Sequence, residues 1–410
     1  MLKAGALYFS LTIAFFIAVI SALLIMLAAH YRGVYLKEIR FARLAENLDS
    51  GSAYVLADQN WVEGKKIMDL YGDGTDSLLL EQKQWGLFDL AVLRSFRLQD
   101  TLQRAFLIGR QTDSVALYLS DEDRPLALSG DTKITGDVVL PKAGIKKAYA
   151  EGKPYANVQT VYGGKMSFSD RNLNELDQSM LKKLKDHLLQ DRERLPLLIQ
   201  SELVVSFLDS TQSFRLAKNA ELNAVALKGN LILFADSSVT ITRSARLTGI
   251  QIYAPVIHIE AGFKGNCQLF ATESIVVEKE VALDFPSVLG VIRTSPSVAQ
   301  PNISLGDHVV FNGIIFSHEQ KRSPLQTLVS LGKETKVKGE VYSTGLVKLS
   351  KGVVIEGKVS CHRFIMQTPV TLYENFLIDV LLNRRARSRY YLSSRLFQGG
   401  QSNHILKWLD

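Results

Sequence analysis

A pattern of hydrophobic positions recurs three times near the end of the chain and once far upstream. Each copy has an aliphatic residue, Leu two positions later, an aliphatic or aromatic residue six positions after that, and then Gly and Ile or Val at steps of two. The copies are Ile303–Ser317, Val329–Ser343, Val347–Cys361 and, upstream, Leu126–Leu140. A fixed-length repeat of short alternating strands must stack on its neighbours to bury a core. The pattern therefore predicts a mainly β fold built around a parallel β-solenoid.

The spacing of the copies predicts how these strands pair. The second and third copies start 18 residues apart, which suits one turn of such a solenoid. Equivalent positions then stack one strand spacing apart, roughly 4.8 Å, which places Lys338 beside Glu356 and Glu340 beside Lys358. The first two copies are 26 residues apart, and the eight additional residues fall in His318–Leu328. We expect that segment to form a loop.

The same alternation extends upstream in a looser form. Leu233–Ala235, Ile252–Ala254 and Leu269–Ala271 each read aliphatic, aromatic, Ala, at intervals of 19 and 17 residues. We therefore predict the main solenoid over residues 203–371.

The upstream copy is followed by a polar stretch and an amphipathic helix. Residues 121–165 are predicted to form an early solenoid-like unit, and residues 166–202 a helical insertion after which the winding resumes. The helix is expected over residues 174–195, because one face would carry Leu176, Met180, Leu181, Leu184, Leu188 and Leu189. The alternative is that Leu126–Leu140 is an ordinary hairpin that matches the template by chance.

The amino-terminal segment predicts a membrane span. Between Gly5 and Ala29 the only polar residues are Tyr8, Ser10, Thr12 and Ser21. As a helix, this length crosses a bilayer of about 30 Å. A cleaved secretory signal has a shorter apolar core and a small-residue cleavage site, which Leu23–Leu27 do not provide. We predict one N-terminal transmembrane helix within residues 1–30; a buried core helix is the alternative.

Residues 31–120 are predicted to form a small membrane-proximal α+β module. Residues 35–48 keep a helical pattern, with Asp49-Ser-Gly51 as a stop. Short strands are expected at Ala53–Leu56, Leu78–Leu80, Trp85–Val92, Phe106–Gly109 and Ser114–Leu119.

Residues 372–410 are predicted to form a C-terminal cap and tail. Tyr373–Leu382 would cover the end of the solenoid, since an open end exposes unpaired strand edges. Tyr391–Phe397 and His404–Trp408 are expected to pair across a turn at Gly399-Gly400.

Charge adds little to this picture. Lys and Arg exceed Asp and Glu by seven over 410 residues, and the excess is scattered. The densest cluster lies in the tail, with Arg384, Arg385, Arg387 and Arg389 next to Tyr390 and Tyr391. We expect a solvated edge around the terminal hairpin; contact with phosphates, lipid headgroups or an acidic glycan is the alternative. Nothing else in the sequence suggests nucleic acid.

The sequence predicts no catalytic, cofactor-binding or metal site. The histidines have no paired or HExxH spacing; they are His30, His187, His258, His308, His318, His362 and His404. Cys361 takes the inward position that Ser317 and Ser343 hold in the other copies, so we expect a core residue there. Cys267 likewise falls in a predicted strand.

A polysaccharide lyase or hydrolase is the enzymatic alternative. Such a site needs two or three carboxylates clustered on neighbouring turns. The carboxylates of the predicted solenoid are Asp236, Glu260, Glu273, Glu278, Glu280, Asp307, Glu340 and Glu356, and they do not fall at stacking positions. The position of Asp307 is taken by Lys333 and Lys351 in the next copies. This alternation of charge favours a solvated wall.

The start of the chain resembles one protein class. Lys3-Ala-Gly5-Ala-Leu-Tyr-Phe-Ser, which leads directly into an apolar helix, is similar to the processed start of pilin-like and pseudopilin-like proteins of type IV filaments and type II secretion systems. The resemblance covers residues 1–30. It implies a helix that anchors the subunit and packs in a filament, with an exported large domain. Those proteins usually carry a glutamate five residues into the mature helix, and Ser10 takes that place here if processing follows Gly5.

The repeat resembles another family, the bactofilins and related polymer-forming bacterial β-helix proteins. The matching residues are Gly136, Gly313, Gly339 and Gly357 with their aliphatic neighbours. This resemblance implies end-to-end polymerisation, in proteins that are mostly cytoplasmic.

Two orientations in the membrane remain open. Arg32, Lys37, Arg40 and Arg43 follow the span, and the positive-inside rule would then keep the bulk in the cytoplasm. The pilin resemblance implies the opposite side.

We predict a non-catalytic structural protein, single-pass in the inner (cytoplasmic) membrane through residues 5–29, with its bulk periplasmic or extracytoplasmic. It would be an atypical pilin-like component of a bacterial filament or secretion apparatus. Its partners would be further copies or envelope machinery, with no nucleic acid, small-molecule substrate or cofactor. A cytoplasm-facing bactofilin-like scaffold is the second hypothesis, and the lyase is the third.

Overall fold

The computed structural model describes residues 2–58, 63–72, 74, 76–156, 162–295, 299–367, 371–397, 399 and 402–409. This part of the chain is mainly β, with one long apolar helix at the amino end and a closed parallel sheet. It divides into two compact units, residues 1–82 with 91–104 and residues 83–90 with 105–410. Each unit is described by itself.

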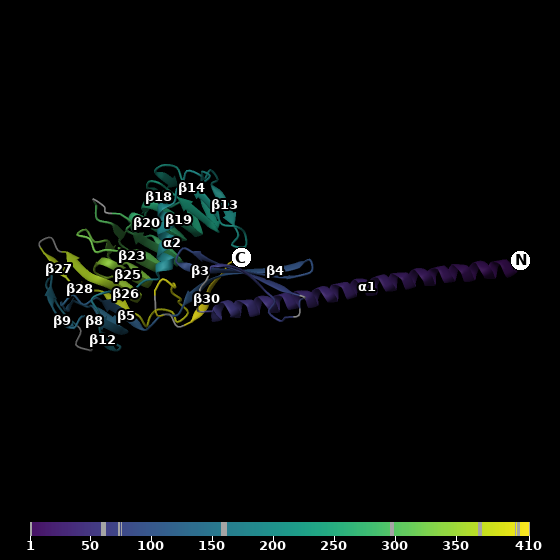
Figure 1. Ribbon diagram of the computed structural model, residues 1–410, viewed down its shortest axis with the longest axis horizontal. Helices are drawn as coiled ribbons and strands as arrows, with labels where there is room; N and C mark the ends of the chain where they lie inside the picture. Colours follow the sequence, from purple (N-terminus) through teal and green to yellow (C-terminus); the bar gives the residue numbers. More distant parts are fainter. Residues whose placement is uncertain are drawn as a thin grey trace. The chain divides into compact units, whose positions relative to one another are not determined.

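The first unit begins with one continuous helix, α1 (Leu2–Ala57), drawn in purple in Figure 1. The predicted stop at Asp49-Ser-Gly51 and the predicted strand Ala53–Leu56 are therefore wrong. A Cβ on Gly51 would lie 2.4 Å from Leu78 Cδ2 and 2.7 Å from Leu93 Cδ2. Glycine at this position allows a close approach of helix and strands, and it does not end the helix.

The strands β1 (Gly64–Met68), β2 (Ser77–Trp85), β3 (Phe88–Arg97) and β4 (Asp100–Arg110) are adjacent in this order. β1 and β2 are antiparallel, with Ile67 opposite Leu79. The strands expected at Leu78–Leu80 and Phe106–Gly109 lie inside β2 and β4. The single strand expected over Trp85–Val92 is instead the end of β2, a turn at Gly86 with φ of +60°, and the start of β3.

The second unit contains α2 (Gln178–Leu189) and most of the strands. The first of these are β5 (Val115–Leu119), β6 (Leu126–Ser129), β7 (Lys133–Thr135), β8 (Asp137–Leu140), β9 (Ile145–Lys147), β10 (Tyr149–Ala150), β11 (Lys153–Pro154) and β12 (Met166–Phe168). After α2 come β13 (Glu202–Val205), β14 (Gln212–Arg215), β15 (Ala220–Leu222), β16 (Ala226–Gly229), β17 (Leu231–Phe234), β18 (Val239–Ile241), β19 (Arg246–Ile259), β20 (Lys264–Val277) and β21 (Ala282–Ile292). The last are β22 (Asn302–Leu305), β23 (Val310–His318), β24 (Leu328–Leu331), β25 (Lys336–Leu349), β26 (Val354–Gln367), β27 (Leu372–Glu374), β28 (Phe376–Ile378), β29 (Leu381–Asn383) and β30 (Asn403–Leu409).

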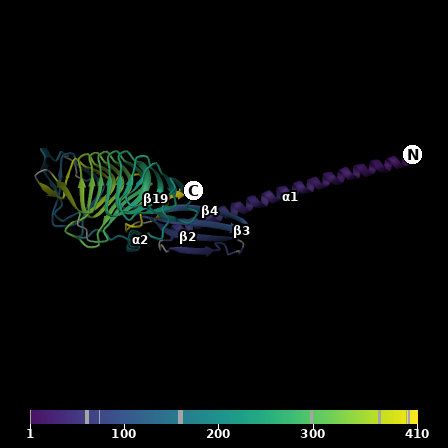
Figure 2. The ribbon, with the colours of Figure 1, turned by 90° about the horizontal axis from the view of Figure 1, so that it is seen from above.

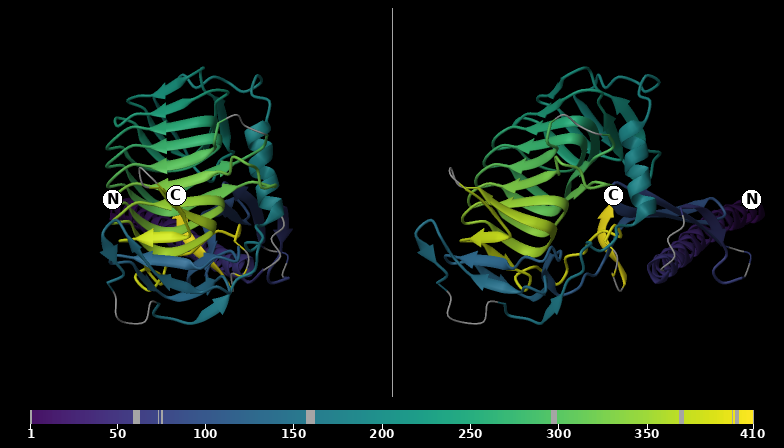
Figure 3. Two further views of the ribbon diagram at one scale, coloured as in Figure 1. Left: turned by 90° about the vertical axis from the view of Figure 1, so that its left-hand side faces the viewer. Right: turned by 60° about the vertical axis from the view of Figure 1, so that its left-hand side comes forward.

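Strands from β13 to β26 pair in parallel with the equivalent strand of the next layer, and the sheet closes on itself. Figures 2 and 3 show these arrows stacked side by side, from teal to yellow along the chain. In β25 and β26, Lys338 lies opposite Glu356 and Glu340 opposite Lys358, so the predicted 18-residue register is confirmed. The loop expected at His318–Leu328 lies between β23 and β24.

The looser upstream pattern follows the same register. Leu233 pairs with Ile252, which in turn pairs with Leu269. The inward residues at these and the later repeat positions form one continuous buried cluster, in which Val337 and Ile355 have no exposed surface. Period-two alternation supplies this core, because every second side chain points inward.

The early copy Leu126–Leu140 joins the closed sheet through β7 and β8. Both pair in parallel, β7 with β29 and β8 with β5, so the alternative of a local hairpin is wrong. β5 also pairs with β26, through Leu117 and Val359. The early segments therefore lie beyond β26, at the end opposite β13, and Figure 3 shows these blue strands beside the yellow ones.

The predicted cap over Tyr373–Leu382 is an inner layer. β29 lies between β26 and β7, and β28 pairs with β6. The end of the stack is thus formed by residues 126–168, whose sequence precedes the main repeats.

The helix expected over residues 174–195 is shorter, at Gln178–Leu189. Asp177 caps it, since its carboxylate accepts the Met180 N–H at 2.9 Å. The buried residues of α2 are Met180, Leu181, Leu184 and Leu188; Leu176 is buried but precedes the helix, and Leu189 is 68% exposed.

The expected hairpin of the tail is also wrong. β30 pairs antiparallel with residues 105–110 of β4, where Trp408 lies opposite Phe106. Ser393, from the other half of the expected hairpin, bridges to Arg110. Gly400, at the expected turn, lies outside the described residues. The open edge of β4 offers backbone partners that a local hairpin would have to supply by itself.

Candidate functional site

The first half of α1 is an exposed apolar surface. Phe15, Ile25 and Met26 are 64%, 71% and 73% exposed, and the most apolar window of the helix has a mean hydropathy of 2.8 with none of it buried. The hydroxyls of Ser10 and Thr12 donate to helix carbonyls four or fewer residues back, so neither needs water. Residues 5–29 are confirmed as part of a helix long and apolar enough to cross a membrane.

The second half of α1 packs on the sheet of its own unit. Leu44, Leu48 and Val55 are almost completely buried. The buried carboxylate of Asp76 receives Arg43 of the helix at 3.0 Å. Hence α1 has an apolar half that no other described residue covers and a half that belongs to a folded unit.

The four basic residues after the predicted span differ in their surroundings. Arg40 pairs with Asp100 at 2.7 Å, and Arg43 with Asp76. Arg32 and Lys37 are exposed on the helix surface. Only these two are in a position to meet lipid headgroups without breaking an ion pair.

In the second unit, one outer column of the parallel sheet is aromatic. The rings of Phe234, Tyr253 and Phe270 stack on successive layers, with centroids 5.4 and 4.9 Å apart. The ring centroid of His187, in α2, lies 5.2 Å from that of Tyr253. Because α2 packs over these rings, the column is a second buried layer and offers no open groove.

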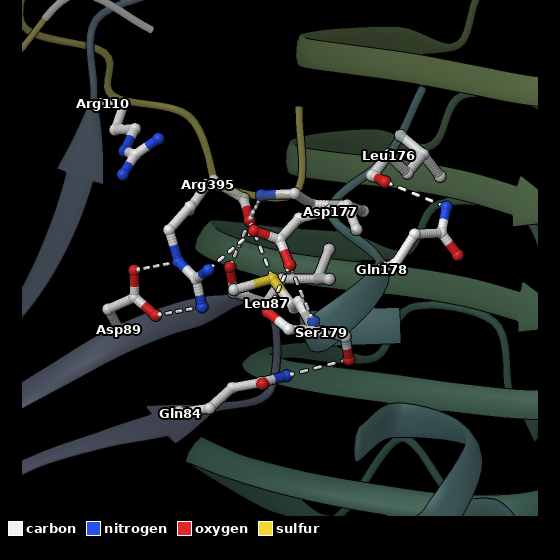
Figure 4. A network of polar contacts seen from close by, with 12 residues as sticks. Gln84, Leu87, Asp89, Arg110, Leu176, Asp177, Gln178, Ser179 and Arg395 are labelled. Carbon is white, nitrogen blue, oxygen red and sulfur yellow. Dashed lines mark hydrogen bonds and ion pairs between the residues drawn. The ribbon is translucent and has the colours of Figure 1, made fainter. Parts of the chain in front are cut away.

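A polar cluster that we call the clasp, consisting of Asp89, Asp177 and Arg395, joins three distant segments (Figure 4). Arg395 donates to Asp89 at 2.9 and 3.3 Å and to Asp177 at 2.7 Å. Burial raises the pKa of Asp89 to about 6, against the opposing effect of Arg395. Burial also acts to raise the pKa of Asp177, but hydrogen bonds from Ser179 and Met180 outweigh it and lower that pKa. The clasp holds the start of β3, the start of α2 and the tail together.

The turn at Gly86 docks on β20 beside the clasp. Gln268 accepts the Leu87 N–H at 2.9 Å and donates to the Trp85 carbonyl at 3.1 Å. A Cβ on Gly86 would fall 2.1 Å from the Gln268 side-chain oxygen, so only glycine allows this contact.

The arginine cluster of the tail is only in part the solvated edge that the sequence predicts: Arg385 and Arg389 are exposed, whereas Arg387 is buried. Arg387 is 7% exposed and pairs with Glu340 at 3.2 Å. Ser393 donates to the same carboxylate at 2.6 Å. Burial raises the pKa of Tyr391, which lies under Arg387, well above its usual value. The tail here is a packed strap over the sheet.

This strap changes one of the two predicted charge pairs. Lys338 and Glu356 lie 3.8 Å apart, as the register predicts. Glu340 instead pairs with Arg387, and Lys358 pairs with Asp113 at 2.7 Å. The sequence indicates which residues are opposite each other, but gives no sign of the third chain segment that covers them.

Other carboxylates of the parallel sheet accept hydrogen bonds from backbone N–H groups at the turns between strands. Asp307 accepts the backbone N–H of Lys333 at 2.7 Å, and Glu278 that of Ala261 at 2.9 Å. Among the described residues no group of three or more His, Cys, Asp or Glu side chains could hold a metal ion. These side chains join layers of the sheet, and they do not converge on one point.

Cys267 and Cys361 are free and fully buried, and both lie in strands as expected. Burial raises the pKa of Cys267 to about 12 and that of Cys361 well above its usual value. Neither thiol is available as a thiolate near neutral pH. The pKa of His318 is lowered by burial to about 4, so this histidine is neutral at pH 7.

Comparison with known proteins gives little. No protein-family model matches the sequence, and no curated protein matches it either. Among solved structures, the competence-associated pilin ComZ from Thermus thermophilus is similar at 10% identity and a TM-score of 0.25, over 85% of this chain and 87% of that one. An overlap at this score carries no argument about function.

Proposed function

We propose that this protein is a non-catalytic, membrane-anchored assembly component of pilin-like type, which displays a β-solenoid. The observation that carries the proposal is the division of α1: an exposed apolar half that needs lipid or other helices as cover, and a second half packed on a folded sheet. The parallel register of β13 to β26 supports a solenoid, since equivalent positions stack layer on layer. The function is mechanical: α1 anchors the protein or joins a helical bundle, and the stacked strands offer a rigid surface.

The location of the bulk is tested by a reporter fused after Asp410. We expect an alkaline phosphatase fusion to be active outside the cytoplasm and a green fluorescent protein fusion to be dark. The reverse result contradicts the exported, pilin-like form of the proposal.

Mass spectrometry of the mature amino terminus tests the pilin-like route separately. Processing near Ala4–Ala6 with N-methylation is the expected result. An intact Met1 would count against it while leaving the membrane anchor untouched.

A cytoplasm-facing scaffold is the second candidate, and one observation favours it. Arg32 and Lys37 are exposed directly after the apolar half of α1, and cations at this position favour the cytoplasmic side. Replacing both by Gln should leave the orientation of the phosphatase fusion unchanged if the protein is exported by a dedicated route. Inversion of the fusion would show that these charges set the topology.

The absence of catalysis is part of the proposal. It is supported by carboxylates that bond to backbone N–H groups or to basic side chains. Release of unsaturated or reducing ends from an acidic polysaccharide, lost in Glu278→Gln, would contradict it.

A further inference from the structure

The arginines after β29 line a cavity in the second unit. Its volume is about 460 Å³, and its walls come from residues 111–114, 136–137, 384–385, 387–389 and 391. Four of the lining side chains carry guanidinium groups, and positive charge gathered in a concave surface raises the local concentration of anions.

Two of these groups are held by neutral oxygens. Arg384 Nε donates to the backbone carbonyl of Asp113 at 3.1 Å, and Arg385 donates to the carbonyl of Gly163. A carbonyl orients a guanidinium group without cancelling its charge. Burial, together with Arg387, lowers the pKa of Arg384, as expected where positive charge is crowded.

The other two groups differ from each other. Arg389 lies 5.0 Å from the ring centroid of Tyr390, again a neutral partner. Arg387 forms an ion pair with the carboxylate of Glu340.

The acidic side chains of the cavity do not balance this charge. Asp113 pairs with Lys358 at 2.7 Å. Hydrogen bonds from the Ser114 hydroxyl and the Lys165 N–H lower the pKa of Asp137, so Asp137 is ionised. With the Arg387 and Asp113 ion pairs set aside, three guanidinium groups face one carboxylate, an excess of two positive charges.

We propose that this cavity binds a phosphoryl group. A phosphate monoester carries about −1.5 to −2 charges at pH 7, which matches the excess, and its three oxygens suit the planar fork of arginine. Arg385 and Arg389 are exposed and supply the accessible donors, while Arg384 is fixed deeper by the carbonyl of residue 113. The source is either a free phosphate compound or a phospholipid headgroup. The proposal does not depend on the proposed assembly function.

The test uses the full chain in dodecyl maltoside micelles and isothermal titration with inorganic phosphate at low ionic strength. We expect saturable binding that weakens as salt rises. Arg385→Ala/Arg389→Ala should weaken it at least about tenfold, the loss expected for charge-assisted hydrogen bonds.

The matched control is Arg246→Ala/Lys264→Ala, which removes the same charge from exposed positions of β19 and β20, away from the cavity. The affinity of this control variant for inorganic phosphate should stay within about twofold of the parent's, a much smaller change than in the cavity variant. All four positions are exposed, and circular dichroism verifies that both variants fold. Equal losses in the two variants would overturn the proposal.

A parallel titration with short-chain phosphatidic acid distinguishes the sources, with short-chain phosphatidylcholine as the zwitterionic control. Binding of phosphatidic acid but not of inorganic phosphate, again lost in Arg385→Ala/Arg389→Ala, would identify a lipid headgroup. Absence of saturable binding for both phosphates overturns the proposal.

Discussion

The glycine of each repeat has a defined role at the level of single atoms. A Cβ on Gly339 would lie 1.9 Å from the carbonyl oxygen of Gly313, and a Cβ on Gly357 would lie 1.7 Å from that of Gly339. Gly339 also has φ of +146°, a region that disfavours other residues. The recurring glycine therefore reflects the close approach of one layer to the next.

This predicts a large cost for Gly339→Ala. The Cβ meets backbone, which cannot rotate away, so we expect the free energy of unfolding to fall by about 2 kcal/mol or more. Urea denaturation followed by circular dichroism measures it. Gly163→Ala is the control, because its Cβ would meet nothing closer than 3.6 Å. Equal stability of the two variants would show that the layers can move apart at no cost.

Asp89 predicts a pH dependence of stability. Its pKa in the folded protein is about 6, against 3.8 for an ordinary aspartate, so the folded state binds the proton more tightly. The free energy of unfolding therefore falls as the pH rises from about 4 to about 6, by roughly 3 kcal/mol at most.

The measurement compares denaturation curves of the parent and of Asp89→Asn between about pH 4 and about pH 6.5, since the variant lacks this titration. The parent should lose stability relative to the variant as pH rises. Asp137→Asn is the control: the pKa of Asp137 is lowered, so its contribution changes only below about pH 4. A pH-independent difference for Asp89→Asn would contradict the role assigned to burial.

At the scale of elements, α1 combines two environments in one helix. Its first half shows no periodic burial, whereas its second half buries Leu44, Leu48 and Val55 along one face. The polar triplet Asp49-Ser-Gly51 reads as a helix end in the sequence, yet Gly51 lies inside the helix against Leu78. Tertiary packing overrides the local preference here.

Two glycines of α1 give a matched prediction. Gly51→Leu should destabilise the first unit by about 1–3 kcal/mol, because the new side chain would overlap Leu78 and Leu93. Gly33→Leu, where nothing lies within 4 Å, should be neutral or stabilising. Thermal unfolding of both variants in micelles measures the difference. A neutral Gly51→Leu would show that helix and strands do not hold this close contact.

At the scale of the whole molecule, the end of the parallel stack is made by residues that come before its first strand in the sequence. β5 pairs with β26, and Ser120 donates its N–H to the Cys361 carbonyl at 3.1 Å. Residues 115–168 thus form the end of the stack next to β26. After α2, the chain begins the opposite end at β13, and successive layers lead back to β26.

Hydrogen exchange measured by mass spectrometry tests this arrangement. The amides that hydrogen-bond between β5 and β26 should open together, because each of these bonds needs both strands in place, while β26 keeps β25 and β5 keeps β8 on its other side. The tail strand β30 and residues 105–110 of β4 should show a comparable link. Protection of the Ser120 amide, which donates to the Cys361 carbonyl of β26, that survives destabilisation of β26 by Gly357→Ala would contradict the pairing.

The strand register was predictable because successive side chains point alternately inward and outward, so a one-residue slip would turn the apolar side chains of a strand outward. The register, the core residues and the loop after β23 follow from this local alternation, and the exposed apolar helix follows from the uninterrupted apolar run of residues 5–29. The failures share a cause: the Ala53–Leu56 strand, the tail hairpin and the burial of Arg387 all depend on which distant segment supplies the partner. The clasp illustrates this, since Asp89 and Arg395 are 306 residues apart and neither belongs to a motif.

By itself, the sequence determined an apolar helix at the amino end, the strand-forming alternation, the glycine at each close approach and the 18-residue register between β25 and β26. These are local properties, set by side-chain periodicity and backbone geometry. Only the tertiary structure decided that the early copy completes the far end of the stack. It alone decided that the tail covers Glu340 with Arg387, and that the arginines beside it surround a cavity. Such choices depend on long-range pairing and burial, which a single segment does not encode.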